Sequence, residues 1–187
     1  FELPVVQPIV RLRTETEGDV SAREALLDAA MGAQRTRKSS ETIRRGRLPA
    51  RGLSLVAETE DGEIVGTVRL WHVHAGAHDE AAVEALLLGP LAVKPGFEGY
   101  GIGSALMRRA IAESTWRGHR AILLVGDAPY YERFGFRAEV TEGLAMPGPF
   151  ERHRLLGLEL APNALTGAEG LIAPSGIEIA NDAATAA

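Results

Sequence analysis

Three glycines at alternate positions separate an apolar segment from a segment of helical periodicity, and this junction constrains the fold more than any other part of the sequence. The apolar segment spans residues 85–93, and the glycines that follow it are Gly99, Gly101 and Gly103. We expect a buried strand over the first segment and a helix over residues 101–117, where apolar side chains recur at helical spacing. The glycines leave unpaired N–H groups at the helix N-terminus, where the helix dipole favours an anion. The junction predicts an anion-binding loop in a fold of mixed strands and helices.

Two common phosphate-binding loops do not match this spacing. A P-loop places Gly-Lys-Ser/Thr after a four-residue gap, and no such lysine is present here. A dinucleotide-binding loop places a third glycine or alanine three residues after Gly103, where this chain has Leu106. For the glycine spacing taken alone, a tight strand-to-helix turn without any ligand stays open.

The other periodicities predict a mixed α/β sheet. Apolar alternation or short apolar runs indicate strands over residues 10–16, 53–59, 64–73, 121–125 and 152–160. Helical spacing and N-cap residues indicate helices over residues 20–27, 38–45 and 129–134. Gly118 stands where the C-terminal cap of the helix over residues 101–117 belongs.

Two short sequences predict details of the sheet. Asp61-Gly62 separates two strand segments, and Asp-Gly is preferred in a two-residue type I′ hairpin turn. Pro90 lies inside the apolar segment over residues 85–93, and proline cannot donate to a sheet ladder. We therefore expect this strand to bulge or to part from a neighbour near Pro90.

Composition excludes several classes of protein. The chain has 187 residues, enough for one well-buried domain, and its formal net charge of −5 argues against a nucleic-acid partner. It has no cysteine, so it has no disulfide, thiolate metal site or cysteine nucleophile. No apolar run approaches the roughly 18 residues of a membrane span, and no signal peptide is visible. We expect a cytoplasmic protein without a membrane partner.

Basic residues are concentrated between Arg35 and Arg51, where seven of them accompany the single acid Glu41. One interpretation is a solvent-exposed helix face. The other is a rim that attracts an anionic cofactor or substrate. Both stay open from the sequence.

The order of motifs resembles the GNAT superfamily of N-acetyltransferases, in particular its bacterial branch of predicted N-acetyltransferases. Val93-x-Pro95 precedes Gly-x-Gly-Ile-Gly over residues 99–103, and after a helix and a strand comes Tyr-Glu-Arg-Phe-Gly-Phe over residues 131–136. In that family Gln/Arg-x-x-Gly-x-Gly/Ala begins the central helix, and Tyr-x-x-x-Gly-Phe follows about 30 residues later. The resemblance covers residues 10–160 in element order and is specific over residues 88–136.

This resemblance implies a fold and a division of the chain. The fold is α/β, with a mixed, mostly antiparallel sheet that is splayed at its central strands and flanked by helices. Residues 1–160 would form a single acetyltransferase domain. Residues 161–187 would be a C-terminal extension that is partly disordered, with the disorder expected over residues 181–187.

The resemblance also implies an activity. The protein would transfer an acetyl group from acetyl-CoA to a primary amine, by direct attack in a ternary complex. The acceptor would be a small molecule or a peptide, and a homodimer is left open. Because the chain has no cysteine, the most natural covalent acyl-enzyme route is absent. A non-catalytic acyl-CoA sensor or partner-binding module on the same fold is the alternative.

Site residues follow from the same resemblance. The backbone of Leu91 and Val93 would pair with the pantetheine arm, and Tyr131 would protonate the departing thiolate, a step that a phenol can perform. Packing of Tyr131 against the Gly135-Phe136 corner is the alternative role. The implied cofactor-binding residues are Leu91, Ala92, Val93, Glu98, Gly99, Tyr100, Gly101, Ile102, Gly103 and Ser104. Glu98 departs from the family pattern, because it stands where Gln or Arg is usual and would repel a pyrophosphate.

The base that deprotonates the amine is not evident from the sequence. Candidates are Glu58, His72, His74 and Glu84, and each is more typical of a surface or sheet-edge position. His72 and His74 would share a face of one strand, as a pair of metal ligands can. Since no third ligand is in view, we expect no metal.

Overall fold

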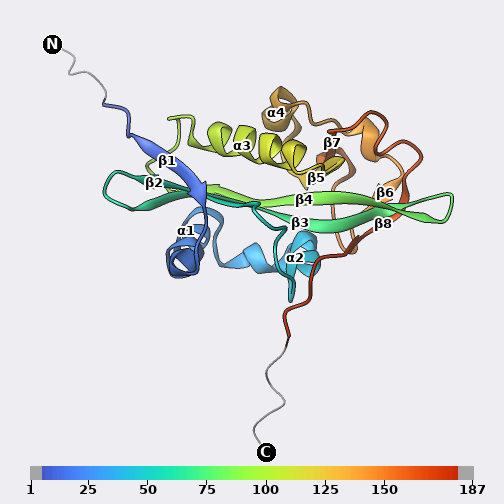
Figure 1. Ribbon diagram of the computed structural model, residues 1–187, viewed down its shortest axis with the longest axis horizontal. Coiled ribbons are helices and arrows are strands. Elements are labelled where there is room, and N and C mark those ends of the chain that lie inside the picture. The colour runs from blue at the N-terminus through green and yellow to red at the C-terminus, as the bar shows by residue number, and fades with distance from the viewer. Residues whose placement is uncertain (1–5, 181–187) are drawn as a thin grey trace, which may run out of the picture.

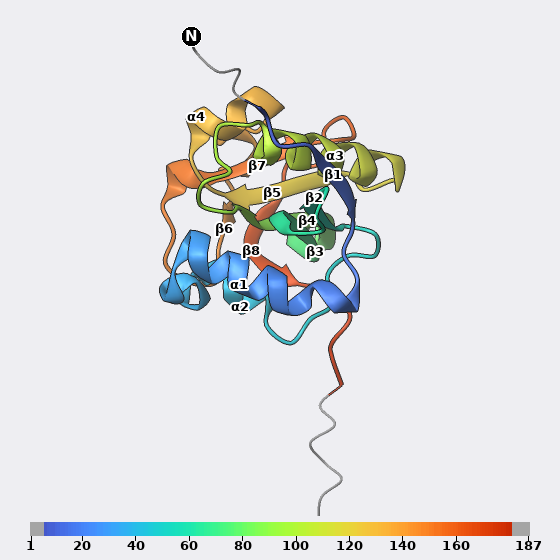
Figure 2. The same ribbon diagram turned by 90° about the vertical axis from the view of Figure 1, so that its left-hand side faces the viewer.

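A computed structural model of the chain describes residues 6–180 and contains a sheet with helices on both faces (Figure 1). The predicted disorder over residues 181–187 lies outside the described residues. Figure 1 and Figure 2 show α1 (Val20–Met31) and α2 (Ser39–Arg44) on one face of the sheet and α3 (Ile102–Trp116) on the other. Within the described residues no helix is long and apolar enough to cross a membrane.

The sheet has eight strands, and six of them follow the order β1-β2-β3-β4-β5-β7. Neighbours in this path are antiparallel except β4 and β5, which are parallel. The remaining strands lie at one end, where β8 pairs with β3 and β6 pairs with β8. The strands are β1 (Val10–Thr14), β2 (Ser54–Thr59), β3 (Ile64–His78), β4 (Ala81–Val93), β5 (Ala121–Val125), β6 (Leu144–Ala145), β7 (Leu155–Glu159) and β8 (Glu169–Pro174). This mixed, mostly antiparallel sheet confirms the expected fold class.

The helices lie where the sequence placed them, with small changes of extent. They are α1 (Val20–Met31), α2 (Ser39–Arg44), α3 (Ile102–Trp116) and α4 (Ala128–Tyr131). Short 3₁₀ helices occupy Glu17–Asp19, Ala33–Arg37, Glu132–Phe134, Glu139–Thr141 and Arg152–Arg154. The predicted cap of α3 is confirmed, because Gly118 has φ +83° and the N–H of His119 donates to the Ser114 carbonyl at 3.0 Å.

Both faces of the central strands are buried, which explains their long apolar runs. On the α3 face, Leu70 and Leu86 pack in a cluster with Leu106. On the α1–α2 face, Trp71 and Leu87 pack in a second cluster. The sheet therefore separates two cores, and a ligand could reach from one face of the sheet to the other only through a gap between strands.

Strand β4 parts from β5 as the sequence predicted. The two strands pair only through Leu86↔Ile122 and Leu87↔Leu123. Beyond them stands Gly89-Pro90, joined by a cis peptide bond, and the register with β3 shifts opposite this pair. We call the resulting gap between β4 and β5 the opening.

The predicted two-residue turn at Asp61-Gly62 is wrong. The loop there has three residues, because the Thr59 N–H donates to the Glu63 carbonyl and only Gly62 has a positive φ, of +82°. A two-residue turn with positive φ at both positions occurs instead at Asp79 and Glu80, which join β3 to β4. Type I′ geometry needs positive φ at both residues, which Asp79 tolerates, and here two long paired strands impose it on Glu80, which does not favour it.

The C-terminal segment contributes a strand that the sequence analysis did not expect. Within residues 161–187, β8 pairs with β3 through Val73↔Pro174, His74↔Ala173 and Ala75↔Ile172. Ile172 is fully buried in the cluster on the α1–α2 face. The division at residue 160 stays a prediction, but part of the segment beyond it belongs to the same sheet and core.

Candidate functional site

The glycine-rich loop lies over a pocket of about 440 Å³, which we call the glycine pocket. Gly99 and Gly101 have φ near +80°, and a Cβ added to either would meet no atom within 4 Å. Gly101 is the N-cap of α3, without a side-chain cap for the free N–H groups. The lining residues are Val93, Phe97, Glu98, Gly99, Gly101, Ile102, Gly103, Ser104, Tyr130 and Arg133. The loop therefore has space and backbone donors for an anion.

Gly103 is held close to an aromatic side chain. A Cβ at Gly103 would lie 2.9 Å from the hydroxyl oxygen of Tyr130 and 3.6 Å from Cγ2 of Val93. The missing side chain lets the α4 segment approach the first turn of α3. Tyr130 thus closes one side of the glycine pocket, a role that the sequence analysis did not assign to it.

The backbone of β4 presents a free edge beyond the opening. The N–H of Lys94 donates to the Val65 carbonyl of β3 at 2.8 Å. Along a strand, the backbone N–H and C=O groups of successive residues point alternately toward one neighbouring strand and toward the other. Ala92 therefore faces β3, while the backbone groups of Leu91 and Val93 point to the side that β5 has left. An extended ligand could pair with them there as an added strand.

Tyr131 lies at the opening itself. It lines a smaller pocket of about 90 Å³, which we call the tyrosine pocket. The other lining residues are Met31, Lys38, Ser40, Arg44, Leu87, Leu88, Gly89, Pro90, Leu91, Leu124 and Val125. This pocket brings residues of the α1–α2 face together with α4 across the sheet.

The environment of Tyr131 keeps its phenol protonated. Burial, followed by the nearby Tyr130 and Asp127, raises the pKa of Tyr131 to about 12. Its ring packs edge-on against Tyr130 at 4.9 Å and lies 6.1 Å from Phe136. In the described part of the chain its hydroxyl has no hydrogen-bond partner. Tyr131 therefore packs against the corner that contains Phe136 and also lines the opening, so the two roles weighed for it are compatible.

The remaining residues of the predicted cofactor site differ in placement. Glu98 lines the glycine pocket but turns back on its own loop, where its carboxylate accepts the Gly96 N–H at 2.7 Å. Ile102 is buried, so only its backbone can face a ligand. Ala92 and Tyr100 line neither the glycine pocket nor the tyrosine pocket.

The four candidate bases lie away from the opening. Glu58 binds Arg11 and Arg13, which lower the pKa of its carboxyl group. The other three, His72, His74 and Glu84, line a separate pocket at the C-terminal end of α3.

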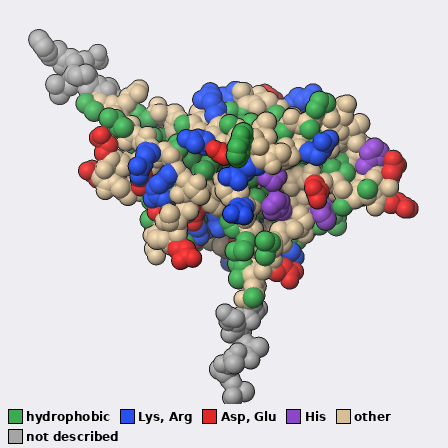
Figure 3. Space-filling model, viewed as in Figure 1, with side chains coloured by type: hydrophobic (Ala, Val, Ile, Leu, Met, Phe, Trp, Pro, Cys, Tyr) green, Lys and Arg blue, Asp and Glu red, His purple; other side chains and the backbone are tan. Residues whose placement is uncertain are grey.

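That separate pocket contains a group of histidines visible in Figure 3. The rings of His72 and His119 are 5.5 Å apart, and burial followed by His72 lowers the pKa of His119. Among the described residues no three His, Cys, Asp or Glu side chains are arranged to hold a metal ion. This pocket shares no lining residue with the glycine pocket or the tyrosine pocket.

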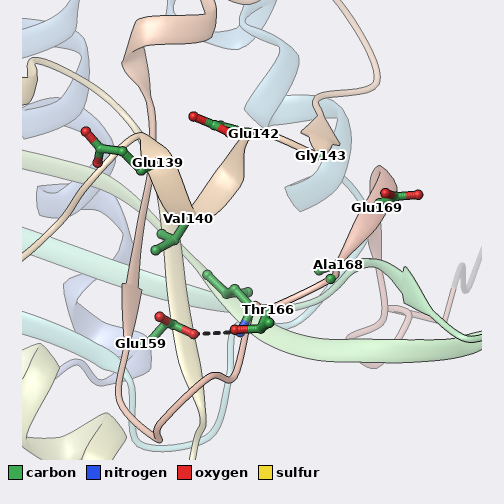
Figure 4. A pocket seen from close by; sticks show the side chains of 10 residues that line it. Glu139, Val140, Glu142, Gly143, Glu159, Thr166, Ala168 and Glu169 are labelled. Carbon is green, nitrogen blue, oxygen red and sulfur yellow. Dashed lines mark hydrogen bonds between the residues drawn. The ribbon is translucent and has the colours of Figure 1, made fainter.

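A further pocket of about 310 Å³ is acidic and lies beside β7 and β8 (Figure 4). Its glutamates are Glu139, Glu142, Glu159 and Glu169. Glu159 accepts the N–H of Leu165 at 3.0 Å, so that carboxylate holds the loop after β7. None of these residues lines the opening.

Comparison with known proteins gives consistent relatives. Residues 50–138 match the family described as acetyltransferase (GNAT) domain. The chain is 30% identical over 125 residues to the N-acetyltransferase YhbS of Escherichia coli K12, and the alignment covers 64% of this chain and 70% of YhbS. It is 33% identical over 122 residues to the N-acetyltransferase YjhQ of the same strain, covering 62% and 66% of the two chains.

Solved structures agree with these sequence relatives. The crystal structure of E. coli YhbS in complex with CoA has a TM-score of 0.73 and 25% identity, covering 94% of this chain and 93% of that one. A GNAT family acetyltransferase from Brucella melitensis in complex with acetyl-CoA has a TM-score of 0.66 and 27% identity, covering 89% and 96%.

Proposed function

Because this chain belongs to the GNAT family of acetyltransferases, we propose that it transfers an acetyl group from acetyl-CoA to a primary amine by direct attack in a ternary complex. The observation that carries the proposal is the opening, where the free edge of β4 runs from Val93 at the glycine pocket to Leu91 in the tyrosine pocket. The two relatives with bound CoA or acetyl-CoA support the choice of donor.

The residues of the glycine pocket fit the pyrophosphate of such a donor. The N–H groups at Gly99 and at residues 101–104 supply donors, and the α3 dipole favours negative charge at this end. Added Cβ atoms at Gly99 and Gly101 would occupy open space beside the loop. We propose that Leu91 and Val93 hold the pantetheine arm through their backbone groups. Bound in this way, acetyl-CoA would supply the thioester at the opening.

Tyr131 is the proposed proton donor. Its raised pKa keeps the phenol neutral at physiological pH, so it can donate a hydrogen bond to sulfur and pass its proton as the C–S bond breaks. A coenzyme thiol is more acidic than this phenol, so complete transfer of the proton to the thiolate is uphill. The phenol would therefore act mainly by a hydrogen bond that stabilises the departing thiolate, and any phenolate formed would take a proton back from water. Its half-buried position excludes part of the water that would otherwise compete for the thioester.

The test separates an enzyme from a sensor of acyl-CoA. Thiol release from acetyl-CoA is measured with a panel of amines and without any amine. We expect release that depends on the amine, and formation of one amide per thiol. Binding of acetyl-CoA without release by any amine would contradict the enzymatic proposal and favour the non-catalytic alternative.

A further inference from the structure

A second cavity, of about 370 Å³, adjoins the tyrosine pocket on the α1–α2 face, and we call it the arginine pocket. Arg44 and Pro90 line both, so the two cavities are neighbours at the opening. The remaining lining residues are Arg23, Glu24, Leu27, Arg35, Thr36, Glu41, Arg45, Gly46, Arg47, Arg69, Trp71 and Ile179. Counted together with Arg44, the described residues that line the arginine pocket include six arginines and two glutamates. A volume of this size suits a small molecule.

Four of the six arginines already have partners. Arg23 binds Glu15 and Glu24, and Arg35 binds Glu24. Arg47 donates to the Gly176 carbonyl at 2.8 Å and pairs with Glu178, and Arg45 donates to the Thr36 carbonyl. These four arginines therefore have hydrogen-bond or ion-pair partners within the protein, and we treat them as structural parts of the pocket wall.

Arg69 is different, because its side chain is only 17% exposed and part of its guanidinium makes no hydrogen bond. Its Nε is buried and unpartnered, and the closest carboxylate oxygen, Oε2 of Glu15, lies 3.9 Å away. The Glu15 carboxylate binds Arg23 through Oε1, and its Oε2 is also buried without a hydrogen bond. The Arg69 guanidinium lies 4.6 Å from the centre of the Trp71 ring, which holds it in place. Burial, followed by the charge of Arg23, lowers the pKa of Arg69, and these effects outweigh the opposing charges of Glu15 and Glu24.

Arg44 is only partly compensated. Its Nη2 lies 3.2 Å from Oε2 of Glu41, and its side chain is 10% exposed. The other amino nitrogen, Nη1, points to the opening, since it would lie 3.1 Å from a Cβ added at Gly89. Burial, opposed by Glu41, lowers the pKa of Arg44. A buried guanidinium with free donors favours a carboxylate or phosphate, whose geometry it matches.

We infer that the acceptor is a small amine that carries an anionic oxygen group, a carboxylate or a phosphate, which Arg69 and Arg44 bind while the amine lies in the tyrosine pocket. This inference rests on the proposed acetyl transfer and specifies its acceptor. It also favours one of the two interpretations of the basic segment over residues 35–51, because Arg44 belongs to that segment. The anionic group would supply the hydrogen-bond acceptor that Arg69 lacks and would orient the amine toward the opening.

Matched pairs of acceptors test the inference on the wild-type protein. Straight-chain ω-amino acids of two to six carbons are compared with alkylamines of the same length, and O-phosphoethanolamine is compared with ethanolamine. We expect the anionic member of at least one pair to have a kcat/KM about 10- to 100-fold higher, the effect of one or two charge-assisted hydrogen bonds. The pair that shows the preference identifies the group as carboxylate or phosphate. Equal or better turnover, in every pair, of the amine that lacks the carboxylate or phosphate would overturn the inference.

A substitution in the arginine pocket tests whether the preference for anionic amines arises there. Arg69→Gln should lower kcat/KM for the anionic amine by about 10- to 100-fold and leave the KM of acetyl-CoA unchanged. Arg47→Gln is the matched control, since that arginine is already paired within the protein, and its effect should be much smaller. A rise in the KM of acetyl-CoA in Arg69→Gln would instead assign the arginine to the donor and overturn the inference.

Binding without turnover separates this inference from the proposed function. The melting temperature is measured in the presence of CoA with each ω-amino acid, with O-phosphoethanolamine and with the matched amines that lack the anionic group. Stabilisation by the anionic amines alone, lost in Arg69→Gln, supports the pocket even if no amine is acetylated. Acetylation of amines without any preference for the anionic ones would retain the enzyme and reject the anionic acceptor.

Discussion

The indole N–H of Trp71 donates a hydrogen bond of 2.6 Å to the carbonyl oxygen of Gly89. Gly89 lies where β4 leaves the regular ladder with β3, as the register shift between Val68 and Leu70 shows. A side chain of β3 therefore supplies the partner that the backbone ladder does not. The bond holds the Gly89-Pro90 segment at the edge of the opening, with Trp71 lining the arginine pocket beneath it.

Trp71→Phe should destabilise the protein and distort the opening. It leaves a buried carbonyl without a donor, at a cost of about 1–3 kcal/mol, which chemical denaturation can measure. Acetyl transfer should slow, because the Gly89-Pro90 segment is no longer held at the edge of the opening. Trp116→Phe is the control, because Trp116 is 82% exposed and should change neither quantity. Equal stability of the two variants would show that the Gly89 carbonyl finds another donor.

Gly101→Ala should impair donor binding beyond its effect on stability. Gly101 and Gly118 flank α3 with φ of +78° and +83°, and neither has an atom within 4 Å of an added Cβ. Alanine in this left-handed region costs about 1–2 kcal/mol at either position. Only Gly101 lines the glycine pocket, so only Gly101→Ala should reduce the rise in melting temperature caused by acetyl-CoA. The same loss in Gly118→Ala would reject the proposed cradle.

Tyr131→Phe should lower kcat and leave donor affinity nearly unchanged. The ring and its packing are kept, while the proton that general acid catalysis uses is removed, a loss of about 10²–10⁴-fold. Tyr130→Phe removes a hydroxyl that lies by Gly103 in the glycine pocket, so it should change the KM of acetyl-CoA more than kcat. Full turnover by Tyr131→Phe would assign the proton to water or to another group.

The pH dependence of kcat follows from the pKa of Tyr131. Burial disfavours the phenolate, so the pKa is raised to about 12 and the acid form persists at higher pH than in a free phenol. Donation by Tyr131 should therefore be lost only as pH rises toward 12. We expect kcat of the wild type to show no descending limb below about pH 10 at saturating substrates. A limb near neutral pH that disappears in Tyr131→Phe would contradict this assignment.

Two adjacent residues of β8 test whether the C-terminal segment supports the fold. Ile172 is fully buried, and Leu171 is 60% exposed. Ile172→Ala should cost about 2–4 kcal/mol of unfolding free energy, while Leu171→Ala should stay within about 0.5 kcal/mol. Small and equal losses would show that residues 161–187 form a separable extension, as the sequence analysis expected.

The sequence predicted what depends on neighbours along the chain. The bounds of β5, the cap at Gly118 and the departure of β4 near Pro90 all follow from local residue types. The turn at Asp79-Glu80 could not be predicted, because the pairing of β3 with β4 imposes a positive φ on Glu80 against its local preference.

Features that depend on distant segments were also missed. Strand β8 pairs with β3 about 100 residues earlier, and its own sequence carries little alternation. The arginine pocket joins Arg44, Arg69 and Trp71, and no spacing in the sequence places their side chains in one cavity. The basic segment over residues 35–51 was the one local indication of it.

The opening in the sheet has a consequence for the kinetics of the proposed reaction. The start of α3 lines the glycine pocket, while α1 and α2 line the arginine pocket, and these helices lie on opposite faces of the sheet (Figure 1). Donor and acceptor would therefore enter from opposite sides. Neither would block the path of the other, and their binding would not have to follow a fixed sequence. A random-order sequential mechanism, with each product competing only against its own precursor, is the pattern that this arrangement favours.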